Sequence, residues 1–397
     1  MGLFTGIKQN VIILGIVSFL TDVSSEMIFP ILPVFLTTIL GIGKEAIGFI
    51  EGVADSASSL LDILVGYWSD KGHRKKFVIA GYGLSSFSKL GIALASTWPF
   101  FLVFRGVERI GKSIRTSPRD AIIAASSGKE TRGKAFGLHR AMDTLGAVLG
   151  PAIAYVILAW LGSTESGYHA VFYAALIPAF LAVAVIWFFV REPKAKQLPP
   201  ALTAKEKVKQ IGFWQKLKLL TGDYKRFLLV SCLFSLAYFS YALLIVRASE
   251  IGISAENILL IYILYNIVYM VFSVPIGQLS DRIGRKPIIV TSFFLYALIV
   301  AGFIFASNFW QVAALFAIYG IFVTTDESVN KAYISDMVKE KERGIALGAY
   351  NTAVGAVYLP ASAIFGALWA GFGAPVAFGA AALVAAISGV AMLVYAK

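Results

Sequence analysis

The sequence predicts an all-α membrane protein with twelve transmembrane helices in two similar six-helix bundles. Three observations lead to this fold class. First, 58% of the 397 residues are hydrophobic and 15% are charged, whereas soluble domains carry about 25% charged residues. Second, apolar stretches of membrane-spanning length recur along the whole chain. Third, one polar sequence motif occurs twice, 211 positions apart, which indicates that one half of the chain duplicates the other.

Twelve apolar stretches have about the length that a helix needs to cross a bilayer, roughly 20 residues. Their approximate ranges are 12–36, 46–68, 77–96, 99–123, 134–160, 169–190, 226–247, 256–279, 288–306, 309–335, 345–370 and 373–395. We expect an amino-terminal bundle over residues 1–190 and a carboxy-terminal bundle over residues 225–397. Residues 191–224 are rich in lysine and contain three prolines, so they are expected to form a cytoplasmic linker.

Basic residues are distributed unevenly between the two sides of this predicted bundle. If the amino terminus is cytoplasmic, 25 of the 35 lysines and arginines lie in cytoplasmic segments, and the opposite loops hold only Lys44. The positive-inside rule then predicts that both termini are cytoplasmic and that the protein lies in the cell membrane. The net charge of +12 therefore reflects topology, and no nucleic-acid partner is expected. The first stretch lacks a small-residue cleavage site, so we expect a retained span and no cleaved signal peptide.

The repeated motif lies at the end of the second and the eighth apolar stretches. Gly66-Tyr-Trp-Ser-Asp70 is followed by Arg74, and Gly277-Gln-Leu-Ser-Asp281 is followed by Arg285. A carboxylate beside basic residues at a helix end can make charge-assisted hydrogen bonds that break when two bundles move. We therefore expect these residues to act in gating: Gly66, Asp70, Arg74, Gly277, Asp281 and Arg285.

Several motifs together resemble the major facilitator superfamily. The repeated motif matches the family's loop motif, and residues 105–111 are similar to its fourth-span motif, with Glu108 and Arg109 in place of glutamine and glycine. Residues 30–33 resemble the P-x-x-P of drug exporters, and residues 146–151 match the G-x-x-x-G-P motif associated with antiporters, without the glycine pair that often follows. Gly146 and Gly150 also share one helix face, which permits close helix packing. The resemblance implies a drug:proton antiporter-like protein with a substrate site between two bundles, built from inverted three-helix repeats, that works by alternating access.

Ionisable residues inside a membrane are costly and are candidates for function. In the family that this chain resembles, spans 1, 4, 7 and 10 line the cavity, and these spans carry most of the charged faces. Arg105 matches the arginine that the family implicates in proton coupling, and we expect Asp22 or Glu26 to take up the proton. The full set expected to bind protons or substrate is Asp22, Glu26, Arg105, Glu108, Arg109, Lys112, Arg140, Asp143, Asp326 and Glu327. Arg140 and Asp143 are three residues apart and can instead pair locally.

A second set of residues is expected to line the substrate cavity. Its members share a helix face with charged or aromatic neighbours: Phe29, Glu51, Asp55, Tyr238, Tyr241, Tyr262, Tyr265, Asn266 and Asn330. A wall of tyrosines suits an organic substrate with an apolar body, although ordinary helix packing explains the same pattern equally well. Acidic and basic residues within the spans nearly balance, so the charge of the substrate does not follow from the sequence.

Other classes of protein fit the sequence poorly. Residues 106–113 match a phosphate-binding pattern but lie inside a membrane-length helix with no preceding strand, so we expect no nucleotide. Three histidines and one cysteine offer no catalytic triad or disulfide, so we expect neither an enzyme nor a cofactor. The favoured function is proton-coupled efflux of a small organic compound by a monomer, driven by the proton gradient. The alternatives are proton-coupled uptake and metal-ion export through acidic residues such as Asp22 and Asp55.

Overall fold

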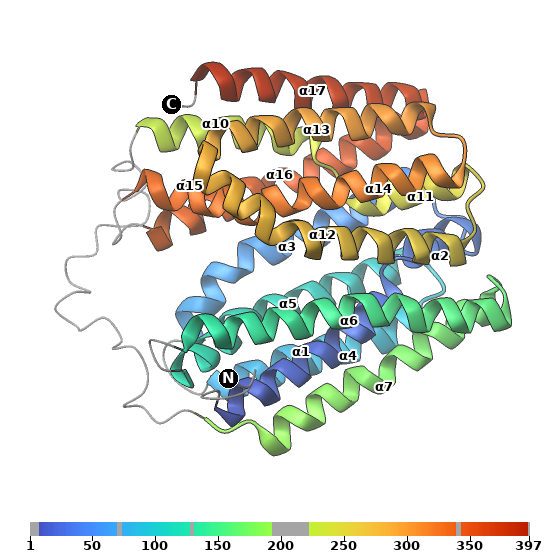
Figure 1. Ribbon diagram of the computed structural model, residues 1–397. Helices are drawn as coiled ribbons and strands as arrows, with labels where there is room; N and C mark the ends of the chain where they lie inside the picture. The colour runs from blue at the N-terminus through green and yellow to red at the C-terminus, as the bar shows by residue number, and fades with distance from the viewer. Residues whose placement is uncertain (1–7, 70–73, 128–130, 193–221, 339–342, 396–397) are drawn as a thin grey trace. The chain divides into compact units, whose positions relative to one another are not determined.

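The computed structural model describes residues 8–69, 74–127, 131–192, 222–338 and 343–395, with only the backbone described at 57–69, 132–133, 327–328 and 343–345. Within these ranges all regular structure is helical and no strand occurs (Figure 1). This confirms the predicted all-α class.

The chain forms two compact units. The first comprises Met1–Leu32 and Ala57–Gln210, and the second comprises Pro33–Ser56 and Ile211–Lys397. Residues 33–56, which were expected in the amino-terminal bundle, are therefore grouped with the second unit. Contacts inside that unit explain the grouping, because Lys44 pairs with Glu250. Most of the predicted linker 191–224 lies outside the described residues, so the bundle boundaries at 190 and 225 stay predictions.

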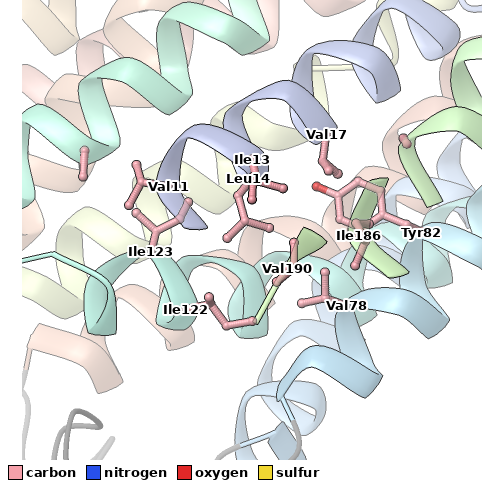
Figure 2. Close-up of a cluster of buried hydrophobic side chains, with 12 residues drawn as sticks. Val11, Ile13, Leu14, Val17, Val78, Tyr82, Ile122, Ile123, Ile186 and Val190 are labelled. Atoms are coloured by element: carbon pink, nitrogen blue, oxygen red, sulfur yellow. The ribbon is translucent and has the colours of Figure 1, made fainter. Parts of the chain in front are cut away.

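The first unit contains five helices and part of a sixth. They are α1 (Gln9–Ile28), α4 (Arg74–Ala93), α5 (Trp98–Ala125), α6 (Arg132–Leu161), α7 (Glu165–Phe189) and the carboxy-terminal part of α3 (Lys44–Ser69). Helix α1 packs against α6 and α7, and α4 packs against α5 and α7. A hydrophobic cluster (Figure 2) joins all five complete helices, with Ala135 as the contribution of α6. Its core is formed by Val11, Leu14, Val17, Val78, Tyr82, Ile122, Ile123 and Ile186.

The second unit contains the amino-terminal part of α3 and the remaining helices. They are α2 (Leu32–Thr38), α10 (Gly222–Ala237), α11 (Tyr241–Glu250), α12 (Ala255–Ile283), α13 (Arg285–Phe305), α14 (Phe309–Thr324), the π-helix η2 (Thr325–Val329), α15 (Asn330–Met337), α16 (Arg343–Phe372) and α17 (Ala374–Tyr395). Helix α17 packs against α10, α13 and α16, and α12 packs against α14.

The helices account for all twelve predicted spans. By length and composition, eight helices of the described residues are long and apolar enough to cross a membrane. The other four predicted spans correspond to α3, α4, α5 and the segment from α14 to α15, which are shorter or carry more polar residues. Helix α5, for example, includes Arg105, Glu108 and Arg109. Buried partners offset the cost of such charges in a membrane helix.

Three spans that were predicted as continuous helices are interrupted. Span 1 breaks between α1 and α2, where Pro30 cannot donate a backbone hydrogen bond and clashes with the preceding turn. Span 7 breaks between α10 and α11 without a proline, and there the backbone N–H of Ser240 donates to Ser362 Oγ at 3.1 Å. Span 10 changes from α-helix to π-helix between α14 and α15. Discontinuous membrane helices commonly form the binding sites of transporters.

Candidate functional site

Two glycines of α6 bring its backbone against the turns of α1 that carry Asp22 and Glu26. A Cβ at Gly146 would lie 2.9 Å from Asp22 Cβ, and a Cβ at Gly150 would lie 3.0 Å from Glu26 Cβ. Such close approach requires residues without side chains. The glycine spacing therefore leads to the close packing that the sequence suggested, and it holds two half-buried carboxyl side chains at the α1–α6 contact.

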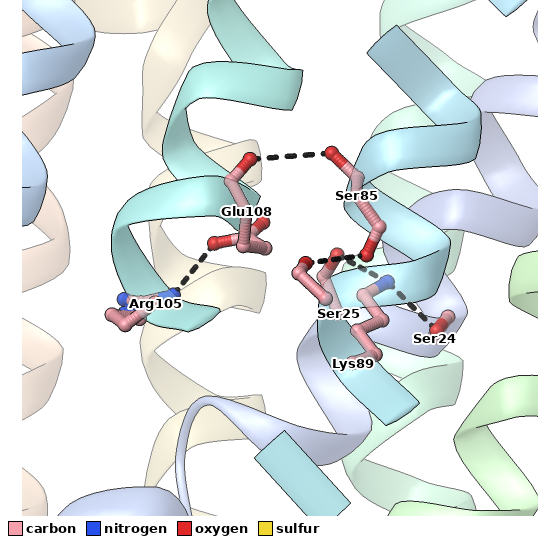
Figure 3. A network of polar contacts seen from close by, with 7 residues as sticks. Ser24, Ser25, Ser85, Lys89, Arg105 and Glu108 are labelled. Atoms are coloured by element: carbon pink, nitrogen blue, oxygen red, sulfur yellow. Dashed lines mark hydrogen bonds and ion pairs between the residues drawn. The ribbon is translucent and has the colours of Figure 1, made fainter. Parts of the chain in front are cut away.

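A buried lysine of α4 contacts the two serines that lie between Asp22 and Glu26 in the sequence (Figure 3). Lys89 Nζ on α4 donates to Ser24 Oγ at 2.7 Å and to Ser25 Oγ at 3.0 Å. Ser24 Oγ in turn donates to the carbonyl oxygen of Ala175 on α7 at 2.6 Å. The exposed fraction of Lys89 is 2%. Lys89 was not among the expected site residues, although a single lysine inside an apolar span was the available signal.

Helix α5 contributes a buried ion pair to the same unit. Arg105 Nη1 lies 2.8 Å from Glu108 Oε2, and each residue is 1% exposed. The guanidinium carbon of Arg105 lies 4.2 Å from the ring centre of Phe29, which directly follows α1. Ser85 Oγ on α4 donates to the carbonyl oxygen of Glu108 at 3.2 Å. The structure thus brings Arg105, Glu108 and Phe29 together at the break in span 1.

The other charged candidates of the first unit have different surroundings. Lys112 and Arg140 are exposed, and the guanidinium carbon of Arg109 lies 5.8 Å from the Phe29 ring centre. Asp143 Oδ2 lies 3.4 Å from Nδ1 of His139, which was not among the expected site residues. The local pairing of Arg140 with Asp143 stays a prediction.

The second unit places an acid and an amide in and beside its π-helix. Asn330 Nδ2 donates to Asp326 Oδ1 at 2.8 Å and to the hydroxyl oxygen of Tyr350 at 3.2 Å. Asn330 is 3% exposed, and its Oδ1 has no hydrogen-bond partner among the described residues. The side chain of Glu327 lies outside the described residues.

Tyrosines from several helices meet beside this acid. The hydroxyl oxygens of Tyr238 and Tyr319 are 3.3 Å apart, and the ring centre of Tyr238 lies 5.8 Å from that of Tyr358. The ring of Tyr319 continues the series, with its centre 5.7 Å from that of Tyr265. Tyr319 and Tyr358 were not predicted, because periodicity within one helix does not show which other helices face it.

The remaining predicted aromatic residues extend this wall along α12. The ring centre of Tyr262 lies 5.5 Å from that of Tyr265 and 6.0 Å from that of Tyr241. Asn266 Nδ2 donates to the carbonyl oxygen of Tyr262 at 3.0 Å. This bond lies within one helix, so it does not by itself assign a role in the cavity to Asn266.

Glu51 and Asp55 belong to the second unit, through the amino-terminal half of α3. Ser56 Oγ donates to the carbonyl oxygen of Gly355 at 2.7 Å and accepts from the backbone N–H of Leu359 at 3.0 Å. Glu51 is buried and Asp55 is half-buried. Because α3 packs on α16, the charge of Asp55 interacts with the hydroxyl of Tyr358.

The structure describes the contacts of the expected gating residues mainly in the second copy of the repeated motif. Arg285 Nη1 lies 3.2 Å from Asp281 Oδ1, and Arg285 also pairs with Asp336 on α15. Gly277 lies on α12. In the first copy, Gly66 lies on α3 and Arg74 begins α4, whereas Asp70 lies outside the described residues. The gating role of all six residues stays a prediction.

Comparisons with known proteins identify relatives along the whole chain. A model of the Major Facilitator Superfamily matches residues 14–247 and 227–397. An uncharacterized MFS-type transporter of Methanocaldococcus jannaschii is 39% identical over 370 residues, which cover 91% of this chain and 89% of that protein.

Solved structures show the same fold at low sequence identity. The nucleoside transporter NupG gives a TM-score of 0.80 at 14% identity, covering 98% of this chain and 100% of that chain. A D-xylose-proton symporter gives a TM-score of 0.76 at 17% identity, covering 98% and 97%. At these identities the likeness concerns the fold alone.

Proposed function

The chain belongs to the Major Facilitator Superfamily, and we propose that this membrane transporter exports a small organic compound in exchange for protons. The transporter is expected to lie in the plasma membrane with both termini in the cytoplasm, as the distribution of basic residues indicates. The proton gradient supplies the energy, and no cofactor is needed.

One observation carries the proton-coupling part of the proposal. Gly146 and Gly150 hold the backbone of α6 against the two turns of α1 that bear Asp22 and Glu26. Protonation of either carboxyl group changes the charge at a tightly packed helix contact, so it changes the free energy of that contact. A proton can therefore bias the position of α1 relative to α6.

Neighbouring charges support the same reading of Asp22. This carboxyl group experiences the negative charges of Glu26 and Asp143 and the positive charges of Lys112 and Arg115. Because charges of both signs act on Asp22, its ionisation responds to small movements of α5 and α6. Substrate binding that displaces one of these helices then releases or takes up the proton.

The direction of transport rests on the G-x-x-x-G-P motif of α6, which this chain shares with antiporters. Proton-coupled uptake is the second candidate, because the same fold also occurs in a D-xylose-proton symporter and is therefore compatible with either direction. No observation on the described residues favours metal-ion export, because no three of their His, Cys, Asp and Glu side chains are grouped to hold a metal.

The test is transport in proteoliposomes that enclose a pH-sensitive dye. We expect proton movement opposite to that of the substrate, and we expect Asp22→Asn and Glu26→Gln each to reduce it. The matched control is Glu165→Gln, because the side chain of Glu165 is 71% exposed at the start of α7. Proton movement in the same direction as the substrate would establish uptake instead. Full pH-driven transport by both variants would refute the coupling role of α1.

A further inference from the structure

We propose that the second unit holds a subsite for a protonated amine with a flat aromatic body, formed by Asp326, Asn330 and the tyrosines around them. The inference rests on the proposed function, because it names the class of compound that the transporter carries. It concerns only residues of the second unit and draws on its hydrogen bonds, charges and aromatic packing.

The hydrogen bonds of Asn330 determine what the ligand must offer. Both bonds of its Nδ2 are directed to partners within the protein, Asp326 and Tyr350. Its Oδ1 is buried without a partner among the described residues, and a buried unpaired acceptor costs free energy. A carboxylate oxygen also only accepts hydrogen bonds. The cluster therefore presents acceptors, and the complementary ligand carries N–H donors.

Two carboxylates contribute negative charge at this place. The charge of Asp326 acts on the hydroxyls of Tyr238, Tyr350 and Tyr358. The charge of Asp55, from α3 of the same unit, also acts on Tyr358. These two negative charges favour a cation over an anion.

The aromatic rings provide the surface for the rest of the ligand. The ring of Tyr238 packs 5.5 Å from Tyr296 and 5.8 Å from Tyr358, measured between ring centres. Aromatic faces stabilise an adjacent cation and bury a flat apolar body. The rings belong to α13, α16 and the break in span 7, so the wall is assembled by tertiary packing.

The backbone at Asp326 is also unusual. Asp326 lies in the π-helix Thr325–Val329, directly before Asn330 begins α15. Single-turn π-helices within longer helices are rare and occur often at functional sites. A carboxylate on an irregular turn, hydrogen-bonded to a buried amide, is the arrangement expected of a ligand-binding group.

The test is a comparison of four indole compounds that share one ring system. They are tryptamine (a protonated amine), its N,N,N-trimethyl derivative (a cation without N–H), tryptophol (neutral) and indole-3-propionate (an anion), and a tricyclic aromatic amine is added to cover larger bodies. Binding to the full-length protein in detergent is measured by titration calorimetry and by the rise in unfolding temperature. We expect the protonated amines to bind most tightly. Equal binding of the trimethyl derivative, tighter binding of the anion or the alcohol, or no binding of either amine would each overturn the proposal.

Variants locate the binding on these residues. Asp326→Asn is expected to weaken amine binding by about 10- to 100-fold, the range for a lost hydrogen bond to a charged group. Asp223→Asn, at the half-exposed start of α10, is the matched control and should bind like the wild type. The unfolding temperature without ligand shows whether each variant folds, and Asp326→Glu keeps the charge and should retain part of the affinity. Unchanged amine binding in folded Asp326→Asn would refute the subsite.

These measurements need no proton gradient, so they separate this inference from the proposed function. Amine binding without proton movement in proteoliposomes would support the subsite and refute proton coupling. Proton-coupled transport of an anion or a neutral compound, with no amine binding, would do the reverse.

Discussion

The contact between α1 and α6 gives the sharpest prediction, through the single substitution Gly150→Ala. A Cβ at position 150 would lie 2.6 Å from the carbonyl oxygen of Val23 and 3.0 Å from Glu26 Cβ. Neither atom can rotate away, because one is backbone and the other is the first side-chain atom. To reach an ordinary contact of about 3.5 Å, the two helices must separate by about 0.9 Å.

Overpacking of this kind costs roughly 1–3 kcal/mol. We expect Gly150→Ala to lower the unfolding temperature in detergent, followed by the fluorescence of the seven tryptophans, and to reduce proton-coupled transport. The control is Gly137→Ala on the same helix, where an added Cβ meets no atom within 4 Å. Since alanine favours a helix by up to about 1 kcal/mol over glycine, this control should be neutral or stabilising. If Gly150→Ala matches Gly137→Ala in both stability and transport, the close contact between α1 and α6 does not control either property.

Three further outcomes follow from contacts described above. Lys89→Met removes both hydrogen bonds from Nζ to α1 and should lower the initial transport rate roughly tenfold, a lost charge-assisted bond being worth about 1.5–3 kcal/mol; an unchanged rate would make Lys89 purely structural. Arg285→Ala should change the free energy of unfolding by less than about 1 kcal/mol, because its ion pairs are partly exposed, yet it should slow transport. A transport rate equal to that of the wild type would exclude gating by this motif. Ser56→Ala removes two hydrogen bonds from α3 to α16 and should lower stability by about 0.5–1.5 kcal/mol per bond, measured by thermal unfolding. The cost stays modest because Gly355 C=O and Leu359 N–H are four residues apart on α16 and can bond each other, and no loss at all would show that these bonds do not stabilise the contact.

The sequence was sufficient for features that depend on local pattern. Apolar length and charge distribution predicted twelve spans, and the structure bears out the helical class. The spacing of Gly146 and Gly150 predicted a close helix contact because glycines four residues apart lie on one helix face. The partner of that contact did not follow from the sequence, and the structure identifies it as α1.

Features that depend on tertiary contacts could not be predicted. The break in span 7 has no proline to mark it and involves Ser362, 122 positions away from Ser240. The hydroxyl partners of Lys89 come from another helix, and Asp55 lies with the second unit because α3 packs on α16. Periodicity shows which residues share a face of one helix, but it does not show which helices face one another.

The break in span 7 has a consequence for the order of assembly during biosynthesis. Neither α10, with 16 residues, nor α11, with 10 residues, is long enough to cross a bilayer alone. Before α16 has been synthesised, the N–H of Ser240 lacks the hydroxyl of Ser362, and an unpaired backbone group in lipid is costly. We therefore expect residues 222–250 to enter the membrane as one continuous helix. The helix breaks only when a segment made much later by the ribosome arrives, so this part of the binding wall is completed at the end of translation.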